Sequence, residues 1–126
     1  MREILFRGKR VDNGEWVYGN YAFTDFDNKQ YFIFQNKAFE HLVIPETVGQ
    51  YTGLTDKNGK KIFEGDIVEY QNGYGHIEWA QLHGAFMCVE ENGDYWEWLD
   101  NMYDIEVIGN IHDIHDNPEL LKGGEG

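Results

Sequence analysis

The sequence predicts a mainly β domain, built as an antiparallel meander with one or two short helices near the C-terminus. Aromatic residues, which favour strands, make up 16% of the 126 residues. Asn-Gly, the strongest short signal for a β-hairpin turn, occurs at 13–14, 58–59, 72–73 and 92–93. Apolar and polar residues alternate between these turns, as at 76–79, where Ile77 and Trp79 share one face of the expected strand.

The expected strands follow one another between the turns. They lie at 3–7, 16–23, 30–35, 43–45 and 47–51, and then, after a hairpin tip at 52–61, at 66–70, 75–80, 85–90 and 104–111. Side chains alternate along a strand, so Trp16 and Tyr18 are expected on one face and Val17 and Tyr21 on the other. The segment Glu64-Gly65-Asp66 predicts a turn in which Asp66 accepts hydrogen bonds from nearby backbone amides.

Two segments near the C-terminus favour helix. Apolar residues at 95, 98, 99, 102 and 103 follow the helical period, and Asp94 with Glu97 resembles a capping box, so we expect a short helix over 94–103. The competing strand arrangement places Trp96 and Trp98 on one face. An N-cap asparagine followed by proline at 117–118 predicts one helical turn over 117–121.

Length and composition indicate one domain at 1–121, with a weak seam near 45–48 that divides it into two lobes and a disordered tail at 122–126. No apolar run reaches the roughly 18 residues of a membrane span. The first residues contain no apolar stretch typical of a signal peptide. We therefore expect a cytoplasmic protein that does not enter membranes.

Charge is distributed unevenly along the chain. Residues 1–61 hold nine basic and eight acidic residues, whereas 62–121 hold fourteen acidic and no basic residues, which gives most of the net charge of −13. A surface of this sign repels nucleic-acid phosphates and attracts basic proteins. It can equally serve only to keep the protein soluble. The candidate partner-binding residues are the carboxylates and tryptophans of one segment: Glu90, Glu91, Asp94, Trp96, Glu97 and Trp98.

The residue types present argue against catalysis and metal binding. The chain contains no serine, which excludes every serine-nucleophile mechanism. Cys88, the sole cysteine, cannot form an intrachain disulfide and is expected to be a small buried apolar residue. The tandem IHDIHD at 111–116 could supply two metal ligands, His112 and His115, but a three-residue duplication in a surface loop accounts for it. We expect no catalytic residues, no cofactor and no metal.

Several motifs resemble one known family. They are FRGKR at 6–10, WVYG at 16–19, VGQYTGLTDKNG at 48–59, EGDIV at 64–68, IGNIH at 108–112 and DNPEL at 116–120. In this order they resemble YopX-like proteins of phages and prophages, whose function is uncharacterised. The resemblance implies an SH3-like barrel element and a location in the cytoplasm of a bacterial host cell. It carries over no catalytic or binding residues.

Three functions are compatible with these features. The first is a non-enzymatic accessory protein that binds a basic host or phage protein through an acidic surface in 62–121. The second is a nucleic-acid-binding SH3-like module, which the net charge disfavours; its footprint would be Arg2, Arg7, Lys9, Arg10, Lys57, Lys60 and Lys61. The third is a structural protein whose basic and acidic halves meet head to tail in a homo-oligomer.

Overall fold

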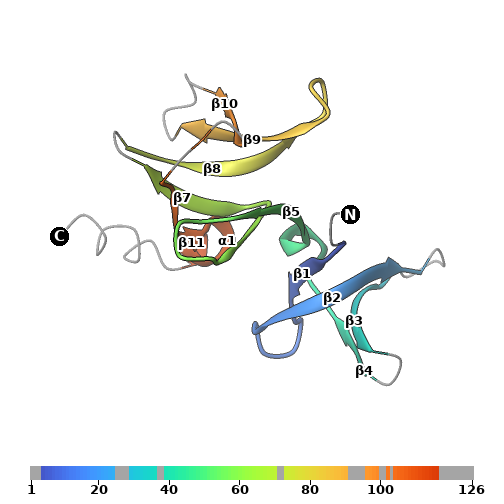
Figure 1. Ribbon diagram of the computed structural model, residues 1–126. Coiled ribbons are helices and arrows are strands. Elements are labelled where there is room, and N and C mark those ends of the chain that lie inside the picture. Colours follow the sequence, from blue (N-terminus) through green and yellow to red (C-terminus); the bar gives the residue numbers. More distant parts are fainter. Residues whose placement is uncertain are drawn as a thin grey trace. The chain divides into compact units, whose positions relative to one another are not determined.

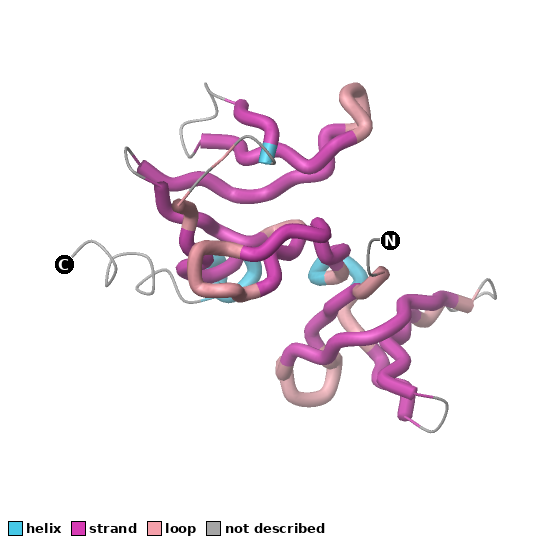
Figure 2. Tube along the Cα trace, in the orientation of Figure 1, coloured by secondary structure: helices cyan, strands magenta, loops and turns pink. Residues whose placement is uncertain are grey.

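The fold of the protein is described by a computed structural model, which covers residues 4–24, 29–36, 39–70, 73–90, 96–99, 102 and 104–116. The chain divides into two compact units, Met1–Tyr51 and Thr52–Gly126. Strands form nearly all of the regular structure in both units (Figures 1 and 2). The predicted mainly β class is therefore confirmed.

The first unit is an antiparallel sheet of consecutive strands. β1 (Phe6–Lys9), β2 (Trp16–Phe23), β3 (Tyr31–Asn36) and β4 (Phe39–Leu42) pair in chain order, and β5 (Gly49–Thr55) begins beside β1. A turn between β1 and β2 forms at the first Asn-Gly pair, although not as a two-residue type I′ turn: the Glu15 amide donates to Asn13 Oδ1 at 2.9 Å, and of the pair only Gly14 has a positive φ, of 73°. Local turn chemistry thus sets this hairpin.

The core of the first unit is small and largely aromatic. Among the residues described there, Val17, Ile33 and Val43 form its buried cluster. Around them, Phe6 lies 5.7 Å from Tyr21, whose ring stacks on Tyr31 with centroids 6.4 Å apart. Ring packing therefore supplies much of the apolar contact in this sheet.

The expected strand at 43–45 is wrong. Val43 makes one isolated bridge to Arg10, and Pro45–Thr47 form a 3₁₀ turn, η1. Proline fixes the φ that this turn needs at its first position. Thr47 then holds the turn against β1, since its hydroxyl donates to the Ile44 carbonyl at 2.6 Å and accepts from the Lys9 amide at 2.9 Å.

The second unit contains a larger sheet. After the hairpin of β5 with β6 (Lys61–Phe63) come β7 (Asp66–Tyr70), β8 (Gly73–Ala80), β9 (Ala85–Glu90), β10 (Trp96–Trp98) and β11 (Glu106–Asn110). The strand order is β10-β9-β8-β7-β11, with every pair antiparallel. Over the described residues neither sheet closes on itself, so the SH3-like barrel element stays a prediction.

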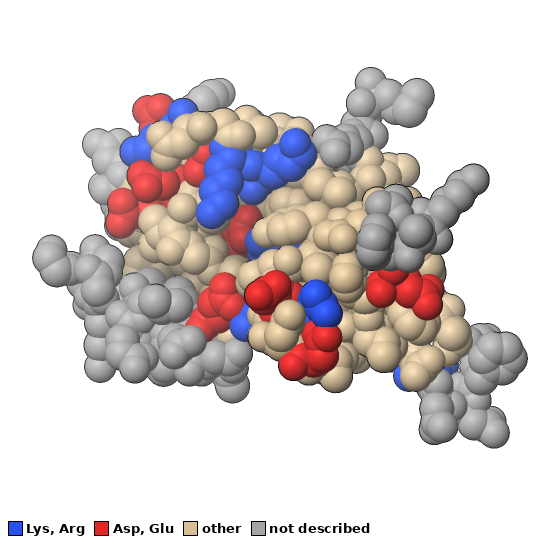
Figure 3. Space-filling view, turned by 90° about the horizontal axis from the view of Figure 1, so that it is seen from below, with Lys and Arg blue, Asp and Glu red and all other residues tan. Residues whose placement is uncertain are grey.

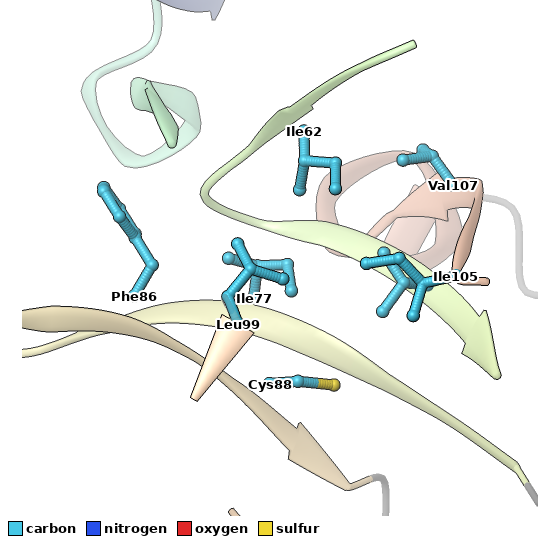
Figure 4. Close-up of a cluster of buried hydrophobic side chains, with 8 residues drawn as sticks. Ile62, Ile77, Phe86, Cys88, Leu99, Ile105 and Val107 are labelled. Atoms are coloured by element: carbon cyan, nitrogen blue, oxygen red, sulfur yellow. The ribbon is translucent and has the colours of Figure 1, made fainter. Parts of the chain in front are cut away.

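A continuous aliphatic core lies on one face of this sheet. Its members come from β6 to β11 and include Ile62, Val68, Ile77, Cys88 and Val107, each with at most 8% of its surface exposed. Figure 4 shows Ile62, Ile77, Cys88 and Val107 converging from separate strands, together with Phe86, Leu99 and Ile105. Burial of this set is the main apolar contribution to the stability of the unit.

The expected helix over 94–103 is wrong at 96–98, where the competing strand forms instead. Residues 96–98 form β10, which pairs with β9 through Trp96↔Val89, Glu97↔Cys88 and Trp98↔Met87. The exposed edge of β9 offers backbone partners that a local periodicity cannot reveal. Pairing with that edge therefore outweighs the helical pattern of apolar residues.

The tandem repeat, expected in a loop, forms the short helix α1 (Ile111–Asp116). Asn110 caps it: its side-chain oxygen accepts from the amides of His112 at 3.1 Å and Asp113 at 2.9 Å. The Asn110 amide group in turn donates to Asp113 at 2.8 Å, which makes a reciprocal capping pair. The helical turn expected over 117–121 and the tail at 122–126 lie outside the described residues.

Candidate interaction surfaces

The candidate partner-binding residues lie at the β9 and β10 edge of the second sheet. Glu90 ends β9 and Glu97 occupies the middle of β10, and both are half-buried. Trp96 and Trp98 are the other two residues of β10. Glu91 and Asp94 lie outside the described residues.

Strand register separates these candidates into two groups. Glu97 pairs with Cys88, and Glu90 follows Cys88 by two residues along β9, so both carboxylates share the face of Cys88. Positions 96 and 98 pair with Val89 and Met87, which belong to the opposite face. The structure therefore brings Glu90 and Glu97 together and does not group them with positions 96 and 98.

Cys88 shares its face with these two carboxylates and is itself buried. Burial, together with the charges of Glu90 and Glu97, raises the pKa of Cys88 to about 11. Only 1% of the Cys88 surface is exposed. The expectation of a buried, apolar cysteine is confirmed, since a thiol of this pKa is protonated at neutral pH and is a poor nucleophile.

Two other carboxylates have structural roles. Asp56, 6% exposed, accepts from the amides of Asn58 and Lys60 at 2.9 Å and from Val107 at 3.0 Å, so it ties the β5–β6 tip to β11. Burial opposes the charged form of Asp56, but these amides and the Lys60 charge outweigh it and lower its pKa. Asp66 accepts from the Phe63 amide at 2.7 Å beside Gly65, whose φ is 92°, as the predicted turn requires.

Several cations of the alternative nucleic-acid footprint are engaged within the chain. Arg7 is 6% exposed and stacks on Trp16, 4.6 Å from the ring centroid. Arg10 pairs with Asp12 at 2.6 Å, and Lys57 pairs with Glu106 at 3.3 Å. These contacts reduce the positive charge that those side chains present to a phosphate backbone.

The histidines do not assemble with other ligands into a metal site within the described part of the chain. His76 pairs with Glu78, and His41 lies 3.1 Å from Gln35. On the face drawn in Figure 3, the acidic side chains of the described residues lie in separate groups.

Two features of the second unit were not predicted. A pocket of ≈ 240 Å³ lies between the β5–β6 tip and the segment that leads into β11. Asp104 on its rim has a φ of 55°, the sole non-glycine residue with positive φ in the described chain. No local sequence signal marks such a pocket, because its walls come from segments some fifty residues apart in the chain.

Comparison with known proteins identifies the family. None of the helices in the described residues is long and apolar enough to cross a membrane. No curated protein matches the chain. Among solved structures, protein EF1440 from Enterococcus faecalis is 27% identical, with 96% of this chain and 99% of that chain covered and a TM-score of 0.54. The sequence pattern described as YopX protein matches residues 5–122, and the chain therefore belongs to the YopX family.

Proposed function

We propose that this protein is a non-enzymatic accessory protein of a phage or prophage, which binds a basic protein partner through carboxylates of its second unit. The observation that carries the proposal is the juxtaposition of Glu90 and Glu97 on one face of the β9–β10 edge. A stretch of sixty residues around them contains no lysine or arginine. Two carboxylates on one face of this edge attract a cation of a basic partner.

Further observations favour a protein over a nucleic acid as the partner. The net charge of −13 opposes approach to phosphates. Arg7, Arg10 and Lys57, which a nucleic-acid footprint would use, are engaged by Trp16, Asp12 and Glu106. The protonated Cys88 thiol supports a binding role rather than thiol catalysis at this edge.

The proposal is tested by capture of partners from a host lysate on the immobilised protein, with and without nuclease, followed by mass spectrometry. We expect a basic protein that survives nuclease treatment and elutes with salt, because screening weakens exposed charge pairs. Capture should fall about tenfold for the double variant Glu90→Lys/Glu97→Lys, equivalent to about 1.4 kcal/mol.

The isosteric variant Glu90→Gln/Glu97→Gln is the matched control for shape. It keeps the side-chain volumes and removes the charge, so its loss of capture should be smaller than that of the lysine variant. Undiminished capture by the lysine variant contradicts the proposal. If the captured proteins are lost after nuclease treatment, the partner is a nucleic acid rather than a basic protein.

A further inference from the structure

The pocket of the second unit has an apolar floor that belongs to the core. Ile62, Leu99 and Ile105 line it with at most 5% of their surfaces exposed, and Met102 adds a flexible half-buried wall. Figure 4 shows Ile62, Leu99 and Ile105 within this cluster. A side chain that enters the pocket would therefore contact the core directly and leave water.

The rim of the pocket is apolar on one side and acidic on the other. Leu54, 38% exposed, forms the apolar side. Asp104 is exposed, and its left-handed backbone conformation costs free energy in a non-glycine residue. Lys57, on the same rim, is paired with Glu106. Asp104 is thus the exposed carboxylate among the lining residues, and Glu106 brings a second negative charge beside Lys57, whereas Asp56 is buried and accepts three backbone hydrogen bonds.

The size of the pocket limits what it can hold. Small-molecule and cofactor sites usually measure about 300–1,000 Å³. A volume of ≈ 240 Å³ is smaller than this range and is better matched by one large side chain. In protein interfaces, such pockets receive the aromatic anchors that dominate binding energy.

We propose that this pocket receives a large apolar side chain, such as that of tryptophan, from a partner segment with lysine or arginine on both sides of it. The inference rests on the proposed function and names the chemistry of the partner. The apolar floor selects the anchor side chain. The acidic rim and the surrounding net negative charge select its basic neighbours.

The test compares two fluorescein-labelled synthetic peptides by fluorescence anisotropy at low ionic strength. Both peptides have lysines flanking one central residue, which is Trp in the first and Ala in the second. We expect the Trp peptide to bind about tenfold more tightly, because burial of the indole adds apolar contact that the methyl group cannot make. Equal affinity for the two peptides overturns the inference, and so does the absence of binding by either.

Two variants separate the apolar side of the rim from its acidic side. Leu54→Ala should reduce the tenfold preference for the Trp peptide, whereas Leu42→Ala, at an equally exposed leucine of the first unit, should leave it unchanged. Asp104→Asn should weaken both peptides alike and preserve the preference. Both pocket changes are at exposed positions, and asparagine tolerates positive φ, so the fold should be retained. An unchanged preference in Leu54→Ala would place the indole elsewhere and contradict the inference.

The outcomes distinguish this inference from the proposed function. If the peptide test fails while lysate capture still depends on Glu90 and Glu97, the pocket is excluded as an anchor site and the acidic edge remains the proposed binding site. If Leu54→Ala abolishes the Trp preference and lysate capture does not depend on Glu90 and Glu97, the pocket is supported and the acidic edge is excluded as the binding site.

Discussion

The two units use the same strand architecture with different interiors and different charge. The first buries three aliphatic residues and relies on rings such as Phe6, Tyr21 and Tyr31 around them. The second buries a continuous cluster of eight residues and adds the buried carboxylate Asp56. It also carries nearly all of the net charge of −13. A larger core can support a strongly charged surface, because apolar burial offsets self-repulsion.

The largest expected effect comes from truncation of equivalent buried isoleucines in the two units. Ile62→Ala should destabilise the second unit by about 4 kcal/mol and Ile33→Ala the first by about 2–3 kcal/mol, although both side chains are fully buried. The difference is expected because the half-buried rings around Ile33 can shift into the space. Urea unfolding with residue-resolved hydrogen exchange measures both values. A larger loss at Ile33 would show that the first unit has the more rigid interior.

A second prediction concerns glycines at which the backbones of two paired strands approach closely, a feature of both units. A Cβ at Gly19 would lie 2.1 Å from the Phe34 carbonyl oxygen, and one at Gly75 would lie 2.4 Å from that of Val89. We expect Gly19→Ala and Gly75→Ala each to cost about 3 kcal/mol, since backbone must move. Gly14→Ala is the control: it meets no atom, and its positive φ costs about 1–2 kcal/mol. Thermal unfolding ranks the three variants, and equal losses would refute the steric explanation.

A third prediction concerns Asp56, one of two carboxylates that are buried among the described residues of the second unit, the other being Asp66. Asp56→Asn should cost about 2 kcal/mol, because an amide group cannot accept all three backbone hydrogen bonds. The pKa of Asp56 is lowered in the folded state, so its contribution is complete above the unfolded pKa of about 3.9 and is lost as pH falls through the folded pKa. Denaturant unfolding of the wild type and of Asp56→Asn, measured from pH 7 to pH 2, should therefore show that the difference between their free energies of unfolding becomes smaller in acid.

The control for this prediction is Asp12→Asn in the first unit. Asp12 is exposed and pairs with Arg10 on the surface, so its replacement should change stability little. A difference between Asp56→Asn and wild type that stays constant into strong acid would contradict the assigned role of the carboxylate.

The smallest expected effect concerns ring stacking in the first unit. A double-mutant cycle of Tyr21→Leu and Tyr31→Leu should give a coupling energy of about 1 kcal/mol, since the rings lie nearly parallel, with an interplanar angle of 7° and centroids 6.4 Å apart. The edge-to-face pair Trp79 and Phe86, 5.0 Å apart, provides the matched cycle in the second unit. A coupling energy of zero between Tyr21 and Tyr31 would show that ring packing does not stabilise the first unit.

Local signals predict much of this fold. The strands Trp16–Phe23, Asp66–Tyr70 and Ala85–Glu90 begin and end where alternation and turn residues place them. The turn at Gly65 and Asp66 forms as expected for the same reason. In each case the information lies within a few residues of the element itself.

Non-local contacts explain what the sequence could not predict. Residues 96–98 become a strand because β9 offers them an edge, and no property of that segment encodes the position of β9. The same register places Glu97 on the face of Glu90 and positions 96 and 98 on the other face, an arrangement that the order of residues along the chain does not reveal. Helix α1 was detectable in principle, because Asn110 and Asp113 have the spacing of a capping pair.

The most direct test of the acidic second unit is the affinity of the captured partner for charge variants that are matched between units. Glu15→Lys/Glu46→Lys changes two exposed carboxylates of the first unit, and Glu90→Lys/Glu97→Lys changes two half-buried carboxylates of the second, with the same change in net charge. We predict an affinity about tenfold lower than wild type for the second variant and little change for the first. Equal losses in both would show that binding depends on net charge alone and would contradict a site on the second unit.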